Sequence, residues 1–450
     1  MILFTRREGA ETRRTITALA LPIFAAEAVN FLAQLIVVAL LGHMGNDAIY
    51  VRSVYQPIAL LMLALTVAFS VTNQVATAVS KGAGRPRDVM THVASLARIW
   101  IVCATAVCVV LVVVAPWLAD LFGVGPDLHD EFVNFLRWIS LAGLLAVGPE
   151  LCASSLRGYG HARRATVLVV CTAVVQIGTV AGLGLGAGSG VEAVPVAQTF
   201  SAVIGTVAGL AMLRGTALWH PPGLRLWRPD ALRGLRCIGV PVGASLLVIS
   251  GYNFAVLGLI GRYGHEVVAG FSAALTLQNL VLLPGTVIGT ATAIVINQQR
   301  GANEWGRMVE SVRRGLEMSA GLYALVAVAV WALASPVAHL LSSDSQVSAS
   351  AQSYLGAVAF SFFFQGPVLT ALTVMEQTGG GLRALVLNTV YFGLIVVAGG
   401  LLAPTLGGAR GFYEVVAWSN VIGVVVPVLV VRHVRQVSQS GLTRVPAASG

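Results

Sequence analysis

The sequence predicts an all-α integral membrane protein with 12 transmembrane helices in two six-helix repeats. Three observations support this fold class. Of 450 residues, 56% are hydrophobic and only 10% are charged, whereas soluble proteins carry about 25% charged residues. The apolar residues form long blocks, where an amphipathic helix would show stripes. The chain also matches itself at one constant offset. A soluble fold is excluded, because so little charge cannot coat a protein of 46.8 kDa.

Twelve apolar stretches are long enough to cross a bilayer, which takes about 20 residues of helix with internally satisfied backbone hydrogen bonds. The expected spans are residues 16–41, 53–79, 93–118, 132–156, 165–187, 191–213, 235–260, 267–297, 316–341, 351–375, 384–404 and 412–431. Arg13 and Arg14 favour a cytoplasmic basic flank over a twin-arginine export signal, because the apolar stretch after them is too long for a cleaved signal. The five cysteines lie in or beside spans without a Cys-x-x-Cys pair, which predicts core residues.

The basic residues mark one side of the membrane. When loops are assigned alternately to the two sides, 24 of 28 basic residues fall on the side of the N-terminus. The positive-inside rule therefore predicts a multi-pass protein of the plasma (inner) membrane with both termini in the cytoplasm. The net charge of +9 is explained by topology and by attraction to anionic lipid, so no nucleic-acid partner is expected.

An offset of 219 residues aligns the first half of the chain with the second. The matches include Arg14 with Arg233, Pro22 with Pro241, Gly42 with Gly261, Gly82-Ala83 with Gly301-Ala302, Gly160 with Gly379, and Arg164-Ala165 with Arg383-Ala384. We expect an N-terminal lobe over 1–213, a cytoplasmic loop over 214–234, and a C-terminal lobe with a short cytoplasmic tail over 235–450. Six spans per repeat place the pseudo-two-fold axis along the membrane normal, as in carriers that work by alternating access.

Glu27 is the main candidate for ion coupling, because it lies near mid-bilayer, about 20 Å beyond Arg14 along a helix. Asn30 and Gln34 share its helix face. Such an acid could bind a proton or a cation, or it could be a permanently protonated structural group. The offset maps Glu27 to Leu246, so acid-based coupling is expected in the N-terminal half alone.

Glu150 is a second candidate for coupling and follows Pro149 in span 4. A solvated or Arg157-paired structural role is equally open for it. Proline kinks helices, and four prolines are candidate hinges. These are Pro22, Pro149, Pro241 and Pro367.

Polar and aromatic side chains within the spans could line a substrate cavity or join neighbouring helices. The candidates for cavity residues are Asn73, Gln74, Gln176, Asn253, Gln278 and Phe364. Motifs for nucleotide binding, zinc hydrolysis and serine hydrolysis are absent from the sequence. We therefore expect that the protein is not an enzyme and that it has no metal or cofactor. Transport should be driven by H⁺ or Na⁺ rather than by ATP.

Several short motifs resemble the multidrug and toxic compound extrusion family rather than the major facilitator superfamily. They are Ser80-Lys81-Gly82-Ala83-Gly84-Arg85 with its repeat Gln299-Arg300-Gly301-Ala302-Asn303, Leu21-Pro22, Gly239-Val240-Pro241, Gly42-His43-Met44-Gly45, and Leu156-Arg157-Gly158-Tyr159-Gly160. The resemblance implies a proton- or sodium-coupled antiporter that extrudes small amphiphilic or cationic compounds. We expect the chain to work as a monomer.

The chain departs from that family where coupling acids usually lie. Apolar Ile36-Val37 replaces the span 1 acid of many members, Ser250 stands where some have Glu, and Gln176 has no carboxylate beside it. Glu27 could be a relocated coupling acid. The alternatives are a lipid-linked glycan or lipid flippase of the same superfamily, which should show basic residues in its cavity, and an intramembrane enzyme.

Overall fold

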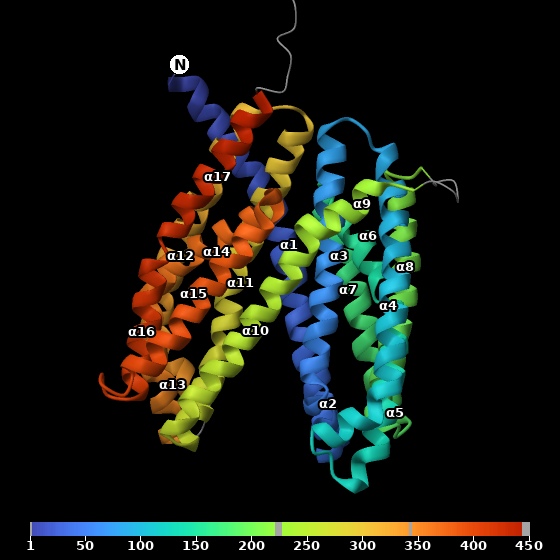
Figure 1. Ribbon diagram of the computed structural model, residues 1–450, viewed down its shortest axis with the longest axis vertical. Coiled ribbons are helices and arrows are strands. Elements are labelled where there is room, and N and C mark those ends of the chain that lie inside the picture. The colour runs from blue at the N-terminus through green and yellow to red at the C-terminus, as the bar shows by residue number, and fades with distance from the viewer. Residues whose placement is uncertain (1, 221–226, 342–343, 443–450) are drawn as a thin grey trace, which may run out of the picture. The chain divides into compact units, whose positions relative to one another are not determined.

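The computed structural model describes residues 2–220, 227–341 and 344–442, and these contain helices and turns but no β-strand (Figure 1). Eleven helical stretches in these ranges are long and apolar enough to span a membrane. The longest, Ser345–Leu402, covers expected span 351–375 and all but the last two residues of expected span 384–404. The all-helical membrane fold is therefore confirmed. Parts of the expected loop (221–226) and tail (443–450) lie outside the described residues.

The chain divides into two compact units. The N-terminal unit is Leu21–Gly243, and the C-terminal unit is Ala244–Gly450 together with Met1–Ala20. The divisions fall within helices, close to Pro22 and Pro241, rather than in the expected loop 214–234. Each unit consequently contains part of a helix whose remainder belongs to the other unit.

Helices of the first repeat begin with a 43-residue helix that has Pro22 inside it. The elements are α1 (Ile2–Met44), α2 (Asn46–Val54), α3 (Gln56–Gly82), α4 (Arg87–Leu121), α5 (Pro126–Gly143), α6 (Val147–Tyr159), α7 (Ala162–Thr179), the π-helix η1 (Val180–Gly186), the 3-10 turn η2 (Gly190–Glu192) and α8 (Ala193–Arg214). They are followed by α9 (Pro229–Gly234) and the π-helix η3 (Leu235–Gly239), which the offset aligns with part of α1 and so places at the start of the second repeat. Expected span 4 is thus two helices, α5 and α6, and Pro149 lies in the first turn of α6, where proline is tolerated.

Helices of the second repeat follow the same order. After α9 and η3, they are α10 (Val240–Ile260), η4 (Gly261–Tyr263), α11 (His265–Gly301), η5 (Trp305–Arg307), α12 (Met308–Leu341), α13 (Ser345–Val358), η6 (Ala359–Ser361), α14 (Phe362–Met375), the π-helix η7 (Glu376–Gly380), α15 (Gly381–Leu402), α16 (Ala409–Ile422) and α17 (Val425–Leu442). Expected span 10 is divided between α13 and α14, as span 4 is between α5 and α6. Pro241 is the second residue of α10, and Pro367 lies inside α14.

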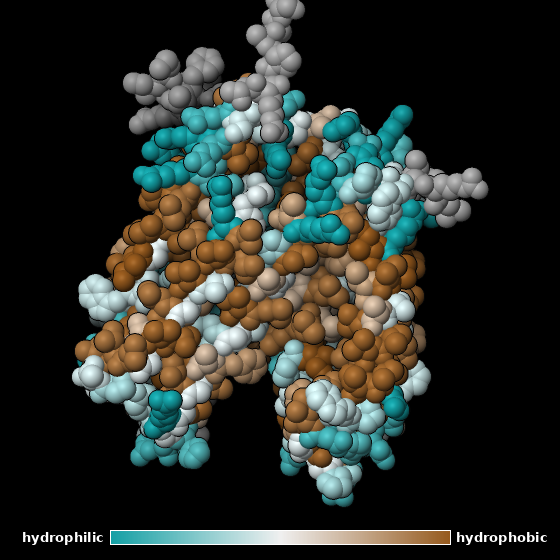
Figure 2. All heavy atoms as spheres, viewed as in Figure 1, coloured by the Kyte–Doolittle hydropathy of each residue, from teal (hydrophilic) through white to brown (hydrophobic). Residues whose placement is uncertain are grey.

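Each unit has its own apolar core and an apolar outer surface. In the N-terminal unit Phe69 packs edge-on against Trp100, and in the C-terminal unit Phe271, Tyr354 and Tyr413 form one aromatic group. Many large apolar side chains remain exposed, including Val113 at 72%. Figure 2 shows hydrophobic residues covering the middle of each unit and hydrophilic residues at its ends. This distribution suits a surface that contacts hydrocarbon.

Candidate functional site

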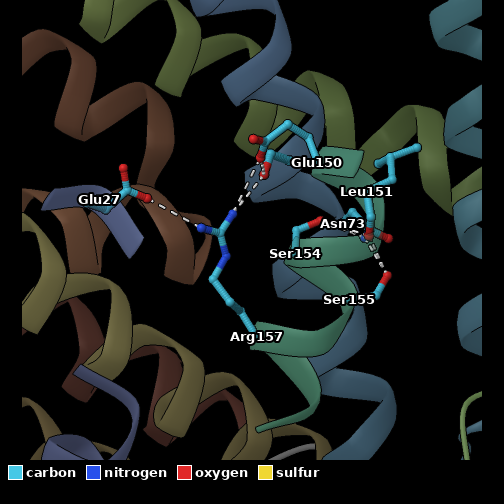
Figure 3. Close-up of polar contacts among 8 residues, drawn as sticks. Glu27, Asn73, Glu150, Leu151, Ser154, Ser155 and Arg157 are labelled. Carbon is cyan, nitrogen blue, oxygen red and sulfur yellow. Dashed lines mark hydrogen bonds and ion pairs between the residues drawn. The ribbon is translucent and has the colours of Figure 1, made fainter. Parts of the chain in front are cut away.

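Arg157 joins two acidic side chains inside the N-terminal unit. The residue is only 9% exposed. Its Nη1 lies 3.4 Å from Oε1 of Glu27 on α1, and its Nη2 lies 3.6 Å from Oε2 of Glu150 on α6 (Figure 3). The two carboxylates are partly exposed, with side-chain exposures of 37% and 36%. One buried cation is therefore shared by two partly exposed acids.

Ser70 on α3 completes this group, which we call the Arg157 cluster (Glu27, Ser70, Glu150, Arg157). The Ser70 hydroxyl donates to Oε2 of Glu150 at 3.3 Å and accepts from Nη2 of Arg157, also at 3.3 Å. Nε of Arg157 is buried and has no hydrogen-bond partner. With both acids ionised the cluster carries a formal charge of −1, so the single cation does not neutralise it.

Tight packing of α6 against α3 fixes the position of Arg157. Glu150 and Arg157 are seven residues apart and so lie on one face of α6. Beside them, the Asn73 amide donates to the Leu151 carbonyl at 2.9 Å and to the hydroxyls of Ser154 and Ser155 at 2.8 Å. These contacts hold α6 rigidly and aim the guanidinium at α1 (Figure 3).

A cavity of about 150 Å³ adjoins the Arg157 cluster. Its polar lining includes Asn30, Glu150, Gln176, Gln198 and Ser201. A space of this size and polarity can hold a few water molecules. The structure thus brings together Asn30 and Glu150 from the predicted coupling residues and Gln176 from the predicted cavity residues. Glu27 is connected to Glu150 through Arg157.

The remaining predicted residues lie elsewhere. Asn73 and Gln74 are buried at the α3–α6 contact region, and Gln34 is exposed on α1. In the C-terminal unit, buried Gln278 accepts a hydrogen bond from the Tyr354 hydroxyl. Asn253 is partly buried on α10, and Phe364 lines a separate cavity of about 810 Å³ with Trp331 and Arg410.

Sequence reasoning underestimated one charged residue and missed another. Arg157 was named only as an open partner for Glu150 at the inner end of span 4, but it is buried and pairs with Glu27 as well. Glu376, just past the expected end of span 10, starts η7 and accepts from the Asn388 amide at 3.1 Å. The same amide contacts the Ser245 hydroxyl at 3.1 Å. The repeat offset could have drawn attention to both residues, because it aligns Arg157 with Glu376 and so places a charged residue at the same position of each repeat.

The order of helices and the repeat agree with a known family. A family model described as MatE matches residues 22–181 and 241–402. The chain belongs to the MatE family. The two matched stretches begin 219 residues apart, at Pro22 and Pro241, which confirms the internal repeat. This family consists of membrane transporters, not enzymes.

Known relatives are named as probable multidrug resistance proteins or as a transporter. The chain is 26% identical over 171 residues to the probable multidrug resistance protein YpnP of Bacillus subtilis, a match that covers 38% of each chain. It is 25% identical over 427 residues to the probable multidrug resistance protein NorM of Geobacillus kaustophilus, over 89% of this chain and 90% of the relative. An FAD transporter of Shewanella oneidensis is 20% identical over 85% and 86% of the two chains.

Solved structures share the fold. The Vibrio cholerae MATE transporter VcmN in the bent form has a TM-score of 0.90 and 16% identity, over 97% of this chain and 99% of that one. A MOP superfamily transporter from Pyrococcus furiosus Vc1 has a TM-score of 0.83 and 17% identity, over 96% and 97%. Its structure is described as having a binding pocket of reverse polarity.

Proposed function

We propose that this MatE-family chain is a secondary active antiporter that exports small amphiphilic or cationic organic compounds in exchange for protons. The observation that carries the proposal is the Arg157 cluster, in which one buried guanidinium is shared by two partly exposed carboxylates. Family membership and the relatives named as multidrug resistance proteins support export as the direction. The chain would work as a monomer by alternating access, with its basic end in the cytoplasm.

The charge of the cluster supplies a physical reason for exchange. Protonation of Glu27 or Glu150 leaves one carboxylate paired with Arg157 and a neutral cluster. Loss of that proton restores a net charge of −1, which is costly in a low-dielectric protein interior unless a cation compensates it. A proton and a cationic substrate would thus compete to neutralise the same site, and competition of that kind couples their movements in opposite directions.

A proton suits this site better than Na⁺. Metal cations in proteins are held by several oxygen ligands at once. Here both carboxylates face nitrogen atoms of Arg157 at 3.4 and 3.6 Å. A Na⁺ ion would have to displace the guanidinium or lie close to its positive charge, whereas a proton needs only one carboxylate oxygen.

The test is transport by the purified protein in sealed proteoliposomes, with a pH gradient or a Na⁺ gradient imposed separately and a fluorescent organic cation as substrate. Wild-type protein should move the cation when driven by the pH gradient alone. Glu27→Gln and Glu150→Gln should lose this driven transport, whereas the matched control Glu304→Gln, which removes an acid that is 45% exposed and pairs with Arg307, should keep it. Transport driven only by Na⁺, or retained by both cluster variants, would refute proton coupling at this site.

A second candidate substrate class is suggested by Arg157 itself. Basic residues in the cavity were the feature expected of a flippase for lipid-linked glycans or lipids, and a distant relative is named an FAD transporter. The net charge of the Arg157 cluster favours cations, but an anion could instead pair with the guanidinium. The same vesicles should therefore be loaded with an anionic and a neutral dye, since faster movement of the anion would favour the flippase alternative.

A further inference from the structure

A cavity of about 580 Å³ lies at the basic end of the C-terminal unit, well separated along the sequence from the Arg157 cluster. We call it the head cavity. Its charged and polar lining includes Arg300 at the end of α11, Trp305 of η5, Arg383 at the start of α15, and His433 and Gln436 of α17. No acidic residue is among the described side chains that line it. The cavity therefore offers cations and hydrogen-bond donors without a negative charge to balance them.

The protonation of His433 follows from its neighbour. Nη1 of Arg383 lies 3.2 Å from Nδ1 of His433. Because a guanidinium only donates, Nδ1 must accept, and the ring hydrogen is assigned to Nε2. His433 is 8% exposed and its Nε2 has no hydrogen-bond partner. Nε1 of Trp305 is also buried without one. Two residues of the cavity wall thus carry N–H donors that lack acceptors, which is unusual for buried polar groups.

The repeat provides an internal comparison, because the offset of 219 aligns Arg300, Arg383 and His433 with Lys81, Arg164 and Arg214. In the N-terminal unit all three cations have internal partners. Lys81 lies over the Tyr159 ring, Arg164 donates to the Gly215 carbonyl at 3.1 Å, and Arg214 lies over the Trp219 ring. In the C-terminal unit Arg300 makes no ion pair or hydrogen bond with a described residue, and Arg383 has only His433.

A second cavity of about 530 Å³ shares Leu382, Arg383, His433 and Gln436 with the head cavity. We call it the tail cavity. The rest of its lining is mainly apolar and includes Met375, Val386, Leu387 and Leu429. Leu382 and Val386 on α15 are 69% and 54% exposed, so the tail cavity opens on the surface that would contact lipid. The two cavities together are cationic at the basic end of the protein and apolar toward the bilayer.

From this arrangement we infer that the head and tail cavities form a binding site for an anionic phospholipid of the leaflet at the basic end of the protein. The phosphate group would lie between Arg300 and Arg383, and an acyl chain would follow Val386 and Leu429. Basic pockets between transmembrane helices are known to hold anionic headgroups. A soluble phosphate ester would use the same cations but would leave the tail cavity empty, which is why a lipid is the better occupant.

The experiment measures lipid retention by the purified full-length chain. The protein is reconstituted in equimolar phosphatidylglycerol and phosphatidylcholine, extracted in mild detergent, and analysed by mass spectrometry for bound lipid. Wild-type protein should retain phosphatidylglycerol in preference to phosphatidylcholine. Arg300→Gln and Arg383→Gln should each weaken this retention about fivefold, the value of one arginine near an anionic surface. The matched control Arg164→Gln, at the equivalent repeat position, should leave it unchanged.

Two further arms separate a lipid from other anions and from misfolding. Val386→Trp fills the tail cavity without changing charge and should also lower phosphatidylglycerol retention. Glycerol phosphate in millimolar excess should not displace the lipid. Equal retention of the two lipids by wild type, equal loss in Arg164→Gln and Arg383→Gln, unchanged retention by Val386→Trp, or displacement by glycerol phosphate would each overturn the inference. The readout is bound lipid, so it does not depend on the proposed transport activity.

Discussion

Positions 157 and 376 correspond in the internal repeat, yet one carries a buried arginine and the other a glutamate. In the N-terminal unit Arg157 lies between two acids and a serine. In the C-terminal unit Glu376 is held by the neutral amide of Asn388, and no described basic residue pairs with it. The two positions are equivalent in the repeat, but their side chains carry opposite charges and have different partners. At this pair of positions, therefore, only the N-terminal unit has a cation that two acids share.

Removal of the arginine should have the largest effect. Arg157→Leu leaves Glu27 and Glu150 without their shared cation, and breaking one partner of a buried ion pair costs about 3–5 kcal/mol. Because both carboxylates are about one-third exposed, we expect about 2–3 kcal/mol of lost unfolding free energy, at the low end or below that range. Thermal and denaturant unfolding in detergent would measure it.

Two comparisons test the cause of that loss. Arg163→Leu removes an exposed arginine from the neighbouring helix and should leave stability nearly unchanged. The triple variant with Arg157→Leu, Glu27→Gln and Glu150→Gln should recover most of the stability, because no uncompensated charge remains. A triple variant as unstable as Arg157→Leu alone would mean that packing, not charge, is what Arg157 supplies.

The sequence was sufficient for the fold because its signal is repeated in every span. Long apolar blocks, the constant offset and the sidedness of the arginines all depend on many residues at once. Glu27 was identifiable because it interrupts an apolar stretch. Arg157 was identifiable only as a possible partner of Glu150, because a basic residue at the end of a span looks the same whether it faces solvent or turns inward. Glu376 was missed because the π-helix η7 extends the helix beyond Met375, where the apolar stretch ends. Which helix faces pack against each other is a property of the tertiary structure, and hydropathy does not encode it.

Close packing beside Arg157 should be the next most sensitive feature. A Cβ at Gly158 would lie 2.4 Å from the Gln74 carbonyl oxygen, so Gly158→Ala forces α6 away from α3. We expect a loss of about 2 kcal/mol in unfolding free energy, typical of overpacking. The equivalent position in the C-terminal unit is Gln377, so this close approach belongs to the N-terminal unit. Gly178→Ala, on a helix surface with open space, is the matched control and should not destabilise the protein in the same unfolding assay.

A smaller effect is expected at the opposite position of the repeat. Asn388→Leu removes one donor to Glu376 and should cost about 1 kcal/mol, because a part-buried carboxylate loses one of its hydrogen bonds. Glu376→Gln keeps the shape and should change stability less. If coupling resides in the Arg157 cluster, Glu376→Gln should also retain transport driven by a pH gradient in proteoliposomes. Loss of driven transport in Glu376→Gln, with normal folding, would show that both units take part in coupling.

The smallest predicted effect concerns His161, which directly precedes α7 four residues beyond Arg157 and corresponds to Gly380 in the C-terminal unit. Burial, followed by the charges of Arg164 and Lys81, lowers the pKa of His161 below its ordinary value of 6.5. The folded state therefore binds this proton less readily than the unfolded state does. The stabilisation is complete above pH 6.5 and is lost as the pH falls through the lowered pKa. His161→Gln should flatten the decline in thermal stability between pH 7 and pH 5. An unchanged pH profile in this variant would show that another group, such as a carboxylate of the Arg157 cluster, governs acid stability.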